Sequence, residues 1–233
     1  MSFNNSSELI FPPTTFSLRL YREFVGGADW MSATRQSFLV ASLTTAVSVA
    51  VGIPAAYALA RADFPGRRLL GMVLLAPMLV PTIAVALGLY LYFSSLGLSG
   101  STLALVLGHS ILTVPFVMVI AMASLRHIDA NLEVAAKVMG AGQMTVFRRV
   151  VLPLLAPAAV AGALFAFLIS FDEVVVAWFV SGIGTATLPV KMYSAIHWEV
   201  SPVLPVVSTL LTGLSLVVCT AGAALQKKDR ADG

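Results

Sequence analysis

Five long apolar stretches, each close to 20 residues, are the feature of this sequence that most limits how it can fold. Of its 233 residues, 58% are hydrophobic and only 11% are charged, against about 25% charged in ordinary soluble domains. A helix of ~20 apolar residues spans the hydrocarbon core of a bilayer. The expected spans are residues 37–60, 69–93, 102–125, 154–176 and 203–225. The sequence therefore predicts an all-α polytopic membrane protein with five transmembrane helices.

Several chemistries are disfavoured by the composition. The sole cysteine, Cys219, lies in an apolar run and excludes a disulfide framework within the chain. The three histidines are widely spaced, which argues against a histidine-based metal site, and no G-x-x-x-x-G-K-[ST] phosphate loop is present. We therefore expect no cofactor or metal in this chain, no catalytic residue, and no nucleic-acid partner.

The positive charges are distributed unevenly between the loops. Loop 96–101 has no Lys or Arg, and segment 181–202 has only Lys191. Ten others lie in loop 61–68, loop 126–151 and the C-terminal tail: Arg61, Arg67, Arg68, Arg126, Lys137, Arg148, Arg149, Lys227, Lys228 and Arg230. Lys and Arg collect on the cytoplasmic side of membrane proteins. This pattern predicts that both of these loops and the C-terminus face the cytoplasm.

The expected organisation has three parts. Residues 1–36 are polar, contain Pro12 and Pro13, and are predicted to form a periplasmic segment with a short amphipathic helix near residues 18–25. Residues 37–225 form the transmembrane domain, and residues 226–233 a cytoplasmic tail. The prolines inside the spans, Pro54, Pro77, Pro81 and Pro115, are expected to bend helices.

Residues 129–151 are predicted to form a helical hairpin on the membrane surface. Asp129 can cap a helix whose first turn carries Glu133, which the positive end of the helix dipole favours. Gly140 allows a sharp turn, and Pro153 suits the start of a further helix. Two apolar stripes are expected, one of Leu132, Ala135, Ala136 and Met139 and one of Met144, Phe147, Val150 and Val151. The small residues allow another surface to approach closely.

The spacing in this hairpin resembles that of permease subunits of binding-protein-dependent ABC importers. Their cytoplasmic loop reads E-A-A, three residues, G, nine residues, I-x-L-P. Here Ala135, Ala136 and Gly140 match, and residues 150–153 read V-V-L-P, so that Leu152 and Pro153 end the motif. The motif glutamate aligns with Val134, whereas Glu133 lies one position earlier. Either Glu133 supplies the charge from a neighbouring face, or this subunit grips its partner without it.

The fourth span contains two acids, Asp172 and Glu173. A carboxylate in hydrocarbon usually faces a cavity or a pathway, so both are candidates for the translocation path; the alternative is a solvated pair in an outer vestibule. Residues 170–175 read S-F-D-E-V-V and resemble the S-F-D-[DE]-V-V stretch of spermidine/putrescine-type permeases, as do residues 187–194 and 201–202.

This resemblance implies the type I permease fold of ABC importers and transport of polyamines or related cationic solutes. It also implies an ATPase dimer that binds ATP, a second permease subunit that is a paralogue of this chain, an extracytoplasmic solute-binding protein, and a bacterial inner membrane location. Glu133, Ala135, Ala136, Gly140, Leu152 and Pro153 would couple to the ATPase. Family members usually have one more helix in front, so we expect a further apolar span encoded ahead of Met1.

Three other interpretations remain open at this point. An ion-coupled secondary transporter would work alone, although the sequence lacks the internal repeat expected of that class. An importer permease for a different small solute is the second alternative, because related members of the same subfamily move other solutes. A non-transporting scaffold would require neither the acids nor the hairpin spacing.

Overall fold

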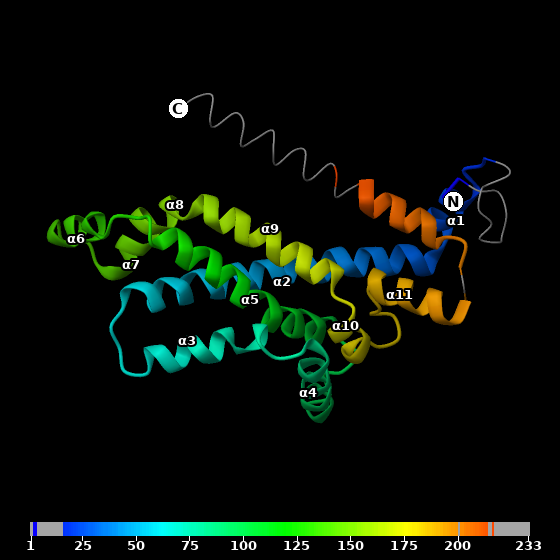
Figure 1. The fold of residues 1–233 in the computed structure, drawn as a ribbon, viewed down its shortest axis with the longest axis horizontal. Coiled ribbons are helices and arrows are strands. Elements are labelled where there is room, and N and C mark those ends of the chain that lie inside the picture. Colours follow the sequence, from blue (N-terminus) through cyan, green and yellow to red (C-terminus); the bar gives the residue numbers. More distant parts are fainter. Residues whose placement is uncertain (1, 4–15, 200, 214–215, 217–233) are drawn as a thin grey trace. The chain divides into compact units, whose positions relative to one another are not determined.

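The computed structural model describes residues 2–3, 16–199, 201–213 and 216. In this part of the chain, every regular element longer than one residue is a helix (Figure 1). The chain divides into two compact units, one of residues 1–34 with 191–233 and one of residues 35–190.

The first unit contains α1 (Arg19–Gly26), the start of α2 (Ala28–Arg61), a π-helix (η3, Ala195–Glu199) and the apolar helix Leu204–Gly213. Helix α1 confirms the short helix expected near residues 18–25. Asp29 in the first turn of α2 lies 4.0 Å from Lys191 Nζ, which also lies 5.7 Å from the centre of the Trp30 ring. An ion pair and a cation–π contact therefore meet at the start of α2.

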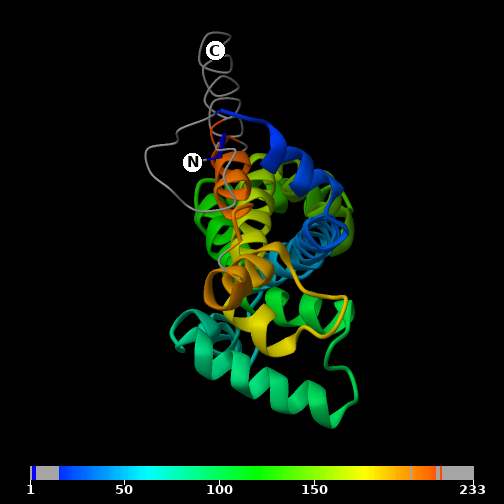
Figure 2. The same cartoon turned by 90° about the vertical axis from the view of Figure 1, so that its right-hand side faces the viewer.

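The second unit holds the remaining helices, and α2 and α11 cross its boundaries. In chain order they are α3 (Arg67–Leu75), η1 (Ala76–Met78), α4 (Thr82–Ser95), α5 (Thr102–Leu125), α6 (Ala130–Val138), α7 (Gln143–Val146), η2 (Phe147–Val151), α8 (Leu152–Leu154), α9 (Ala156–Asp172), α10 (Val175–Val180) and α11 (Leu188–Ser194). Figure 1 shows α2, α5 and α9 running side by side, and Figure 2 shows α4 directed away from them.

Helix α5 packs against both α2 and α9, and glycines let the three helices approach closely. A Cβ atom added to Gly52 of α2 would lie 3.0 Å from Val117 Cγ1 of α5, and one added to Gly162 of α9 would lie 3.4 Å from the same atom. Val117 is 1% exposed. Because lipid removes the hydrophobic drive for helices to associate, small residues that permit dense packing hold such bundles together.

Hydroxyl and imidazole groups join the same three helices. Ser48 Oγ of α2 and Thr113 Oγ1 of α5 lie 2.7 Å apart, and His109 Nδ1 of α5 lies 2.9 Å from Ser170 Oγ of α9. His109 is fully buried, and its Nε2 has no hydrogen-bond partner among the described residues. Hydrogen bonds between buried side chains stabilise helix pairs in membranes by roughly 0.6 kcal/mol each.

The expected spans match the helices unequally. The third is confirmed, since α5 covers Thr102–Leu125 without a break despite Pro115. The first is confirmed as a helix but begins nine residues earlier than expected, because Ala28 follows the Gly26–Gly27 break directly. Helix α2 passes Pro54 without ending.

The second expected span is wrong as a single helix. Segment Arg67–Met78 and helix α4 meet at an angle of 103°. The bend lies at Pro77 and Pro81: Pro77 is in the 3₁₀ turn η1, and Pro81 is extended (φ −54°, ψ 128°) directly before α4. Each proline removes a backbone donor, so the helix cannot continue across the pair without losing hydrogen bonds.

The fourth span ends earlier than expected, at Asp172 instead of residue 176. A 74° bend separates Gln143–Leu154 from α9. Among the described residues, two helices are long and apolar enough to cross a bilayer, and up to four spans result if each bent pair counts as one. Residues 214–215 and 217–225 of the expected fifth span lie outside the described residues, as does the tail 226–233.

The close approach of α2 to α5 generates a test of this packing. Replacing Gly52→Leu inserts a branched side chain against Val117 and is expected to destabilise the bundle by about 1–3 kcal/mol. Gly88→Leu on α4 is the matched control, because a Cβ added there meets nothing within 4 Å. Thermal unfolding in detergent, followed by tryptophan fluorescence, should show a lower midpoint for Gly52→Leu alone. Equal midpoints for the two variants would contradict the proposed packing.

Candidate functional site

The predicted hairpin is present, and the geometry of its first arm and turn follows from two residues. Asp129 Oδ1 accepts a hydrogen bond of 2.9 Å from the backbone N–H of Asn131 and caps α6. Gly140 has φ +89°, a left-handed conformation that favours glycine, and there the chain turns from α6 towards α7. Figure 1 shows α6 and α7 at the same end of the second unit as the α2–α3 loop.

The second arm of the hairpin changes helix type before it joins α9. Residues Phe147–Val151 form a π-helical turn, followed by α8 with Pro153 in its first turn. The proline ring crowds the carbonyl four residues earlier and has no N–H to donate. The wider π turn accommodates this loss, and such turns are frequent at functional sites. Pro153 thus starts a helical segment, as predicted.

A buried ion pair attaches the hairpin to α2. Glu133 is 4% exposed, and its Oε1 lies 2.9 Å from Nε of Arg61 at the C-terminal end of α2. The Arg61 guanidinium also donates from Nη2 to the backbone carbonyls of Leu125 (3.2 Å) and Ile128 (2.8 Å). The positive charge therefore meets the carboxylate and also the negative end of the α5 dipole.

Tyr57, one turn before Arg61, contacts three parts of the hairpin. Its Oη donates a 2.8 Å hydrogen bond to Glu133 Oε2 on α6 and accepts one of 3.3 Å from Gln143 Nε2 on α7. Its ring lies 5.0 Å from the ring of Phe147 in η2. We call Arg61, Tyr57 and Glu133 the anchor. Because the Arg61 side chain keeps 24% of its exposure whereas that of Glu133 is nearly buried, removing one partner should cost less than the ~3–5 kcal/mol of a fully buried pair and more than the ~1 kcal/mol of a surface pair.

The side of α6 away from the anchor is exposed and apolar. Val138 is 82% exposed and Met139 81% exposed. The other exposed apolar residues of the hairpin are Leu132, Val134 and Met144, and with Val138 and Met139 they form what we call the apolar patch. The exposed cationic residues Lys137, Arg148 and Arg149 lie on the same hairpin. Side chains of this kind in water indicate a surface that another protein covers.

Of the remaining residues predicted to couple to the ATPase, some are exposed and one is buried. Ala135, Gly140, Leu152 and Pro153 are exposed, and Ala136 is buried against the core. The expected stripe of α6 therefore faces outward except at Ala136. In the second arm, Val151 and Val146 are fully buried, whereas Met144, expected in the stripe, is exposed.

Sequence reasoning missed the two anchor residues on α2. Arg61 was counted only as one loop charge among ten, and Tyr57 was not singled out. Tyr57 and Arg61 are four residues apart, which places them on one face of a helix. That spacing could have indicated a shared contact, but only the fold shows that the contact is Glu133, 72 residues after Arg61.

The two predicted acids lie at the opposite end of α9 from the hairpin, about 25 Å along the helix. Asp172 is the last residue of α9 and is exposed. Glu173 follows in extended conformation, and its Oε1 accepts a 2.9 Å hydrogen bond from the backbone N–H of Val176 in α10. The acids are therefore at a helix break, and Glu173 has a capping role that the sequence did not indicate.

Phenyl rings surround the end of α9. Phe167 and Phe171 of α9 stack with centroids 5.7 Å apart, and Phe38 of α2 meets Phe171 edge-on at 5.1 Å. Aromatic faces attract ammonium groups, as carboxylates do. Phe171 directly precedes Asp172, so both kinds of cation-binding group occur at this end of the helix.

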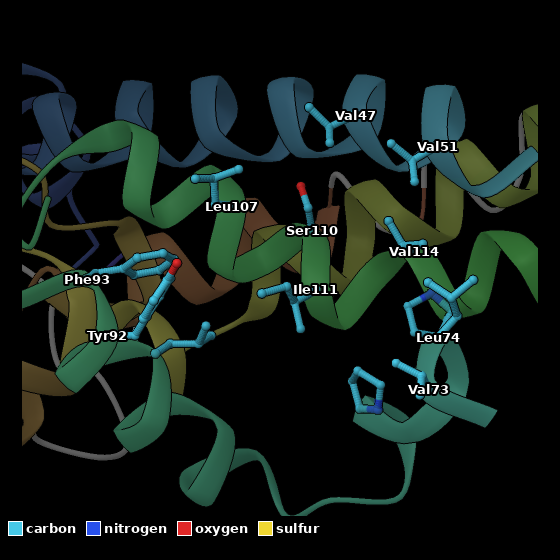
Figure 3. A pocket seen from close by; sticks show the side chains of 13 residues that line it. Val47, Val51, Val73, Leu74, Tyr92, Phe93, Leu107, Ser110, Ile111 and Val114 are labelled. Atoms are coloured by element: carbon cyan, nitrogen blue, oxygen red, sulfur yellow. The ribbon is translucent and has the colours of Figure 1, made fainter. Parts of the chain in front are cut away.

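The second unit also contains an apolar groove. Figure 3 shows a groove of about 510 Å³ lined by side chains of α2, α3, α4 and α5, among them Val51, Val73, Phe93 and Ile111. Its lining residues include no carboxylate. Ser110, which points into it, already donates a 2.7 Å hydrogen bond to the Val106 carbonyl. The groove is thus unsuited to a hydrophilic cation.

Membrane-spanning helices that carry a helical hairpin with this spacing define the transmembrane subunit of an importer. The model of the family described as "Binding-protein-dependent transport system inner membrane component" matches residues 48–228. The chain belongs to this family.

Individual relatives agree with this assignment. The chain is 32% identical over 229 residues to the spermidine/putrescine transport system permease protein PotC of Escherichia coli (strain K12), covering 98% of this chain and 86% of the relative. It is 32% identical over 216 residues to the putrescine transport system permease protein PotI of the same strain, covering 90% and 77%.

A solved structure shares the fold. The chain superposes with a TM-score of 0.71 on a bacterial ABC transporter involved in the import of the acidic polysaccharide alginate, at 20% identity, covering 86% of this chain and 70% of the other. The type I permease fold expected from the hairpin motif is confirmed.

The left-handed turn of the hairpin provides a test with a control in the same loop. Gly140→Val forces a branched residue to φ +89°, which costs about 1–2 kcal/mol. Gly142→Val is the control, because Gly142 has φ −68° and open space around its Cα. Hydrogen–deuterium exchange of residues 130–151 should rise for Gly140→Val only. The expected geometry is wrong if both variants exchange like the wild type.

Proposed function

We propose that this chain is the membrane-spanning subunit of an ATP-driven importer for polyamines such as spermidine and putrescine, or for related cationic solutes. The hairpin of residues 129–151 receives a separate ATPase dimer, which binds and hydrolyses ATP, so this chain holds no cofactor and makes no covalent bond. The observation that carries this proposal is the exposed apolar patch on a hairpin that is anchored from behind by buried charges.

The distribution of charges supports a cytoplasmic position for the hairpin. Arg67 and Arg68 at the start of α3 share one end of the bundle with Lys137, Arg148 and Arg149 of the hairpin. Positive residues favour the cytoplasmic side. The chain is then a multi-pass protein of the bacterial inner membrane with its C-terminus in the cytoplasm, and Asp172 faces the other side.

The hairpin also supports a set of partners. One hairpin offers one docking surface, so an ATPase dimer needs a second permease subunit, which we propose is a paralogue of this chain. An extracytoplasmic binding protein delivers the solute to the end of the bundle that carries Asp172.

The case for a cationic solute rests on two independent supports. By their names, PotC belongs to a spermidine/putrescine transport system and PotI to a putrescine transport system, and they resemble this chain over at least 90% of its length. The end of α9 presents an exposed carboxylate beside phenyl rings. Because Glu173 caps α10, we assign the solute contact mainly to Asp172.

Docking through the apolar patch is tested by adding a charge. Met139→Asp places an unpaired carboxylate in the proposed interface and should lower recovery of the ATPase with tagged, affinity-purified chain at least roughly tenfold, equivalent to ~1.4 kcal/mol. Arg68→Asp, also exposed at this end of the bundle but outside the hairpin, should leave recovery unchanged. Full recovery with Met139→Asp would exclude the patch as the docking surface.

The solute assignment is tested by uptake. Cells that lack other polyamine uptake systems and express the whole transporter should accumulate radiolabelled spermidine or putrescine. Asp172→Asn should reduce this uptake roughly tenfold, the loss expected for one charge-assisted contact of ~1.4 kcal/mol. Asp63→Asn, which neutralises an exposed acid in the α2–α3 loop, is the control. Uptake of neither polyamine by the wild type would refute the solute while leaving the docking surface intact.

A further inference from the structure

The position of Glu133 differs from that expected of a residue that touches the ATPase. Of the nine residues of α6, only Glu133 and Ala136 are buried. Val134, where the family motif has glutamate, is 56% exposed. The hairpin therefore presents an apolar side chain to its partner at that position and keeps its carboxylate inside the chain.

The attachment of α6 to the bundle depends mainly on that carboxylate. Ala136 offers one methyl group, which can slide against its neighbours at little cost. Glu133 instead uses both oxygens, one 2.9 Å from Arg61 Nε and one 2.8 Å from Tyr57 Oη. One hydrogen bond and one ion pair, both to α2, resist a displacement that pulls α6 away from the bundle.

The helix that receives these contacts reaches the centre of the bundle. Ser48, which is bonded to Thr113 of α5, lies 13 residues before Arg61 on α2, or about 20 Å along the helix. Gly52, between them, is in close contact with Val117. A displacement of Arg61 along α2 is therefore passed to α5 through tight packing and a hydrogen bond.

We propose that the anchor of Arg61, Tyr57 and Glu133 is the rigid link through which movement of the hairpin displaces α2, and that Glu133 is a positioning residue inside this chain instead of an ATPase contact. This inference rests on the proposed function, because it requires an ATPase to move the hairpin. It also accounts for Val134 at the position of the motif glutamate: apolar side chains hold the partner, and the carboxylate of Glu133 transmits the movement.

The experiment uses the whole transporter, purified through a tag on this chain and placed in lipid nanodiscs. Three variants are compared with the wild type: Glu133→Gln, Tyr57→Phe and Asp63→Asn. Asp63→Asn is the matched control, since Asp63 also pairs with an arginine, Arg67 at 3.1 Å, but its side chain is fully exposed. Retention of the ATPase, ATP hydrolysis, and hydrogen–deuterium exchange with and without ATP and vanadate are measured, none of which depends on the identity of the solute.

In the wild type and Asp63→Asn, nucleotide should change exchange both in the hairpin, residues 130–151, and in α2, residues 53–61. In Glu133→Gln the ATPase should remain bound and active, and the nucleotide-dependent change in α2 should be lost while that in the hairpin persists. Tyr57→Phe keeps the ring beside Phe147 and should lose part of the α2 response. If Glu133→Gln does not accumulate, the α2 response of Tyr57→Phe tests the proposed link in its place.

Two results would overturn this inference. Loss of the ATPase from Glu133→Gln, with the hairpin folded as judged by its exchange, would make Glu133 a direct contact. An unchanged α2 response in Glu133→Gln, or in Tyr57→Phe where only that variant accumulates, would show that movement reaches α2 by another route. Absence of any ATPase from the wild-type preparation is a different result, which refutes the proposed function itself.

Discussion

Close packing of α2 and α9 against α5 is the constraint on which the rest of the second unit depends. Lipid offers apolar side chains the same surroundings as a protein interior, so burial alone does not bring helices together. Gly52 and Gly162 admit Val117 between α2 and α9, and the Ser48–Thr113 and His109–Ser170 contacts fix the three helices axially. The hairpin at one end and the acids at the other keep a defined separation because this bundle is dense.

The breaks in the helices locate the functional residues. Each interruption, at Pro81, at the π turn before Pro153 and after Asp172, leaves backbone groups that need other partners. At the last of these, Glu173 supplies its side chain to α10. Close by, Gly100 and Gly182 bring two loops together: the Gly100 N–H donates to the Val180 carbonyl at 2.9 Å, and Thr185 Oγ1 donates to the Gly100 carbonyl at 3.0 Å. At this end of α9, irregular backbone is therefore hydrogen-bonded by specific side chains and by a neighbouring loop.

The anchor explains how a small hairpin can serve two surfaces. One side of α6 must stay apolar and open to accept a partner, which leaves few residues to attach the helix to the rest of the chain. A buried charge pair provides strong attachment from one position, provided that its remaining polar atoms are satisfied. Tyr57 and the carbonyls of Leu125 and Ile128 meet that condition.

The sequence by itself determined the features that depend on local chemistry. Apolar length predicted α5 with its bounds and most of α2. Asp129, Gly140 and Pro153 predicted the cap, the turn and the new helix, because each acts on the backbone within a few residues. The motif spacing predicted the family.

Only the tertiary structure decided what depends on residues far apart in the chain. In the folded chain Glu133 lies inward, against Arg61 and Tyr57. The second span bends by 103° at Pro77 and Pro81, and the Glu173 side chain accepts a hydrogen bond from the backbone of α10. Composition could not reveal these outcomes, because a charge on a helix has no preferred side until a neighbouring helix supplies its partner, and a proline, tolerated within α2 and α5, ends a helix only where the surrounding packing favours a turn.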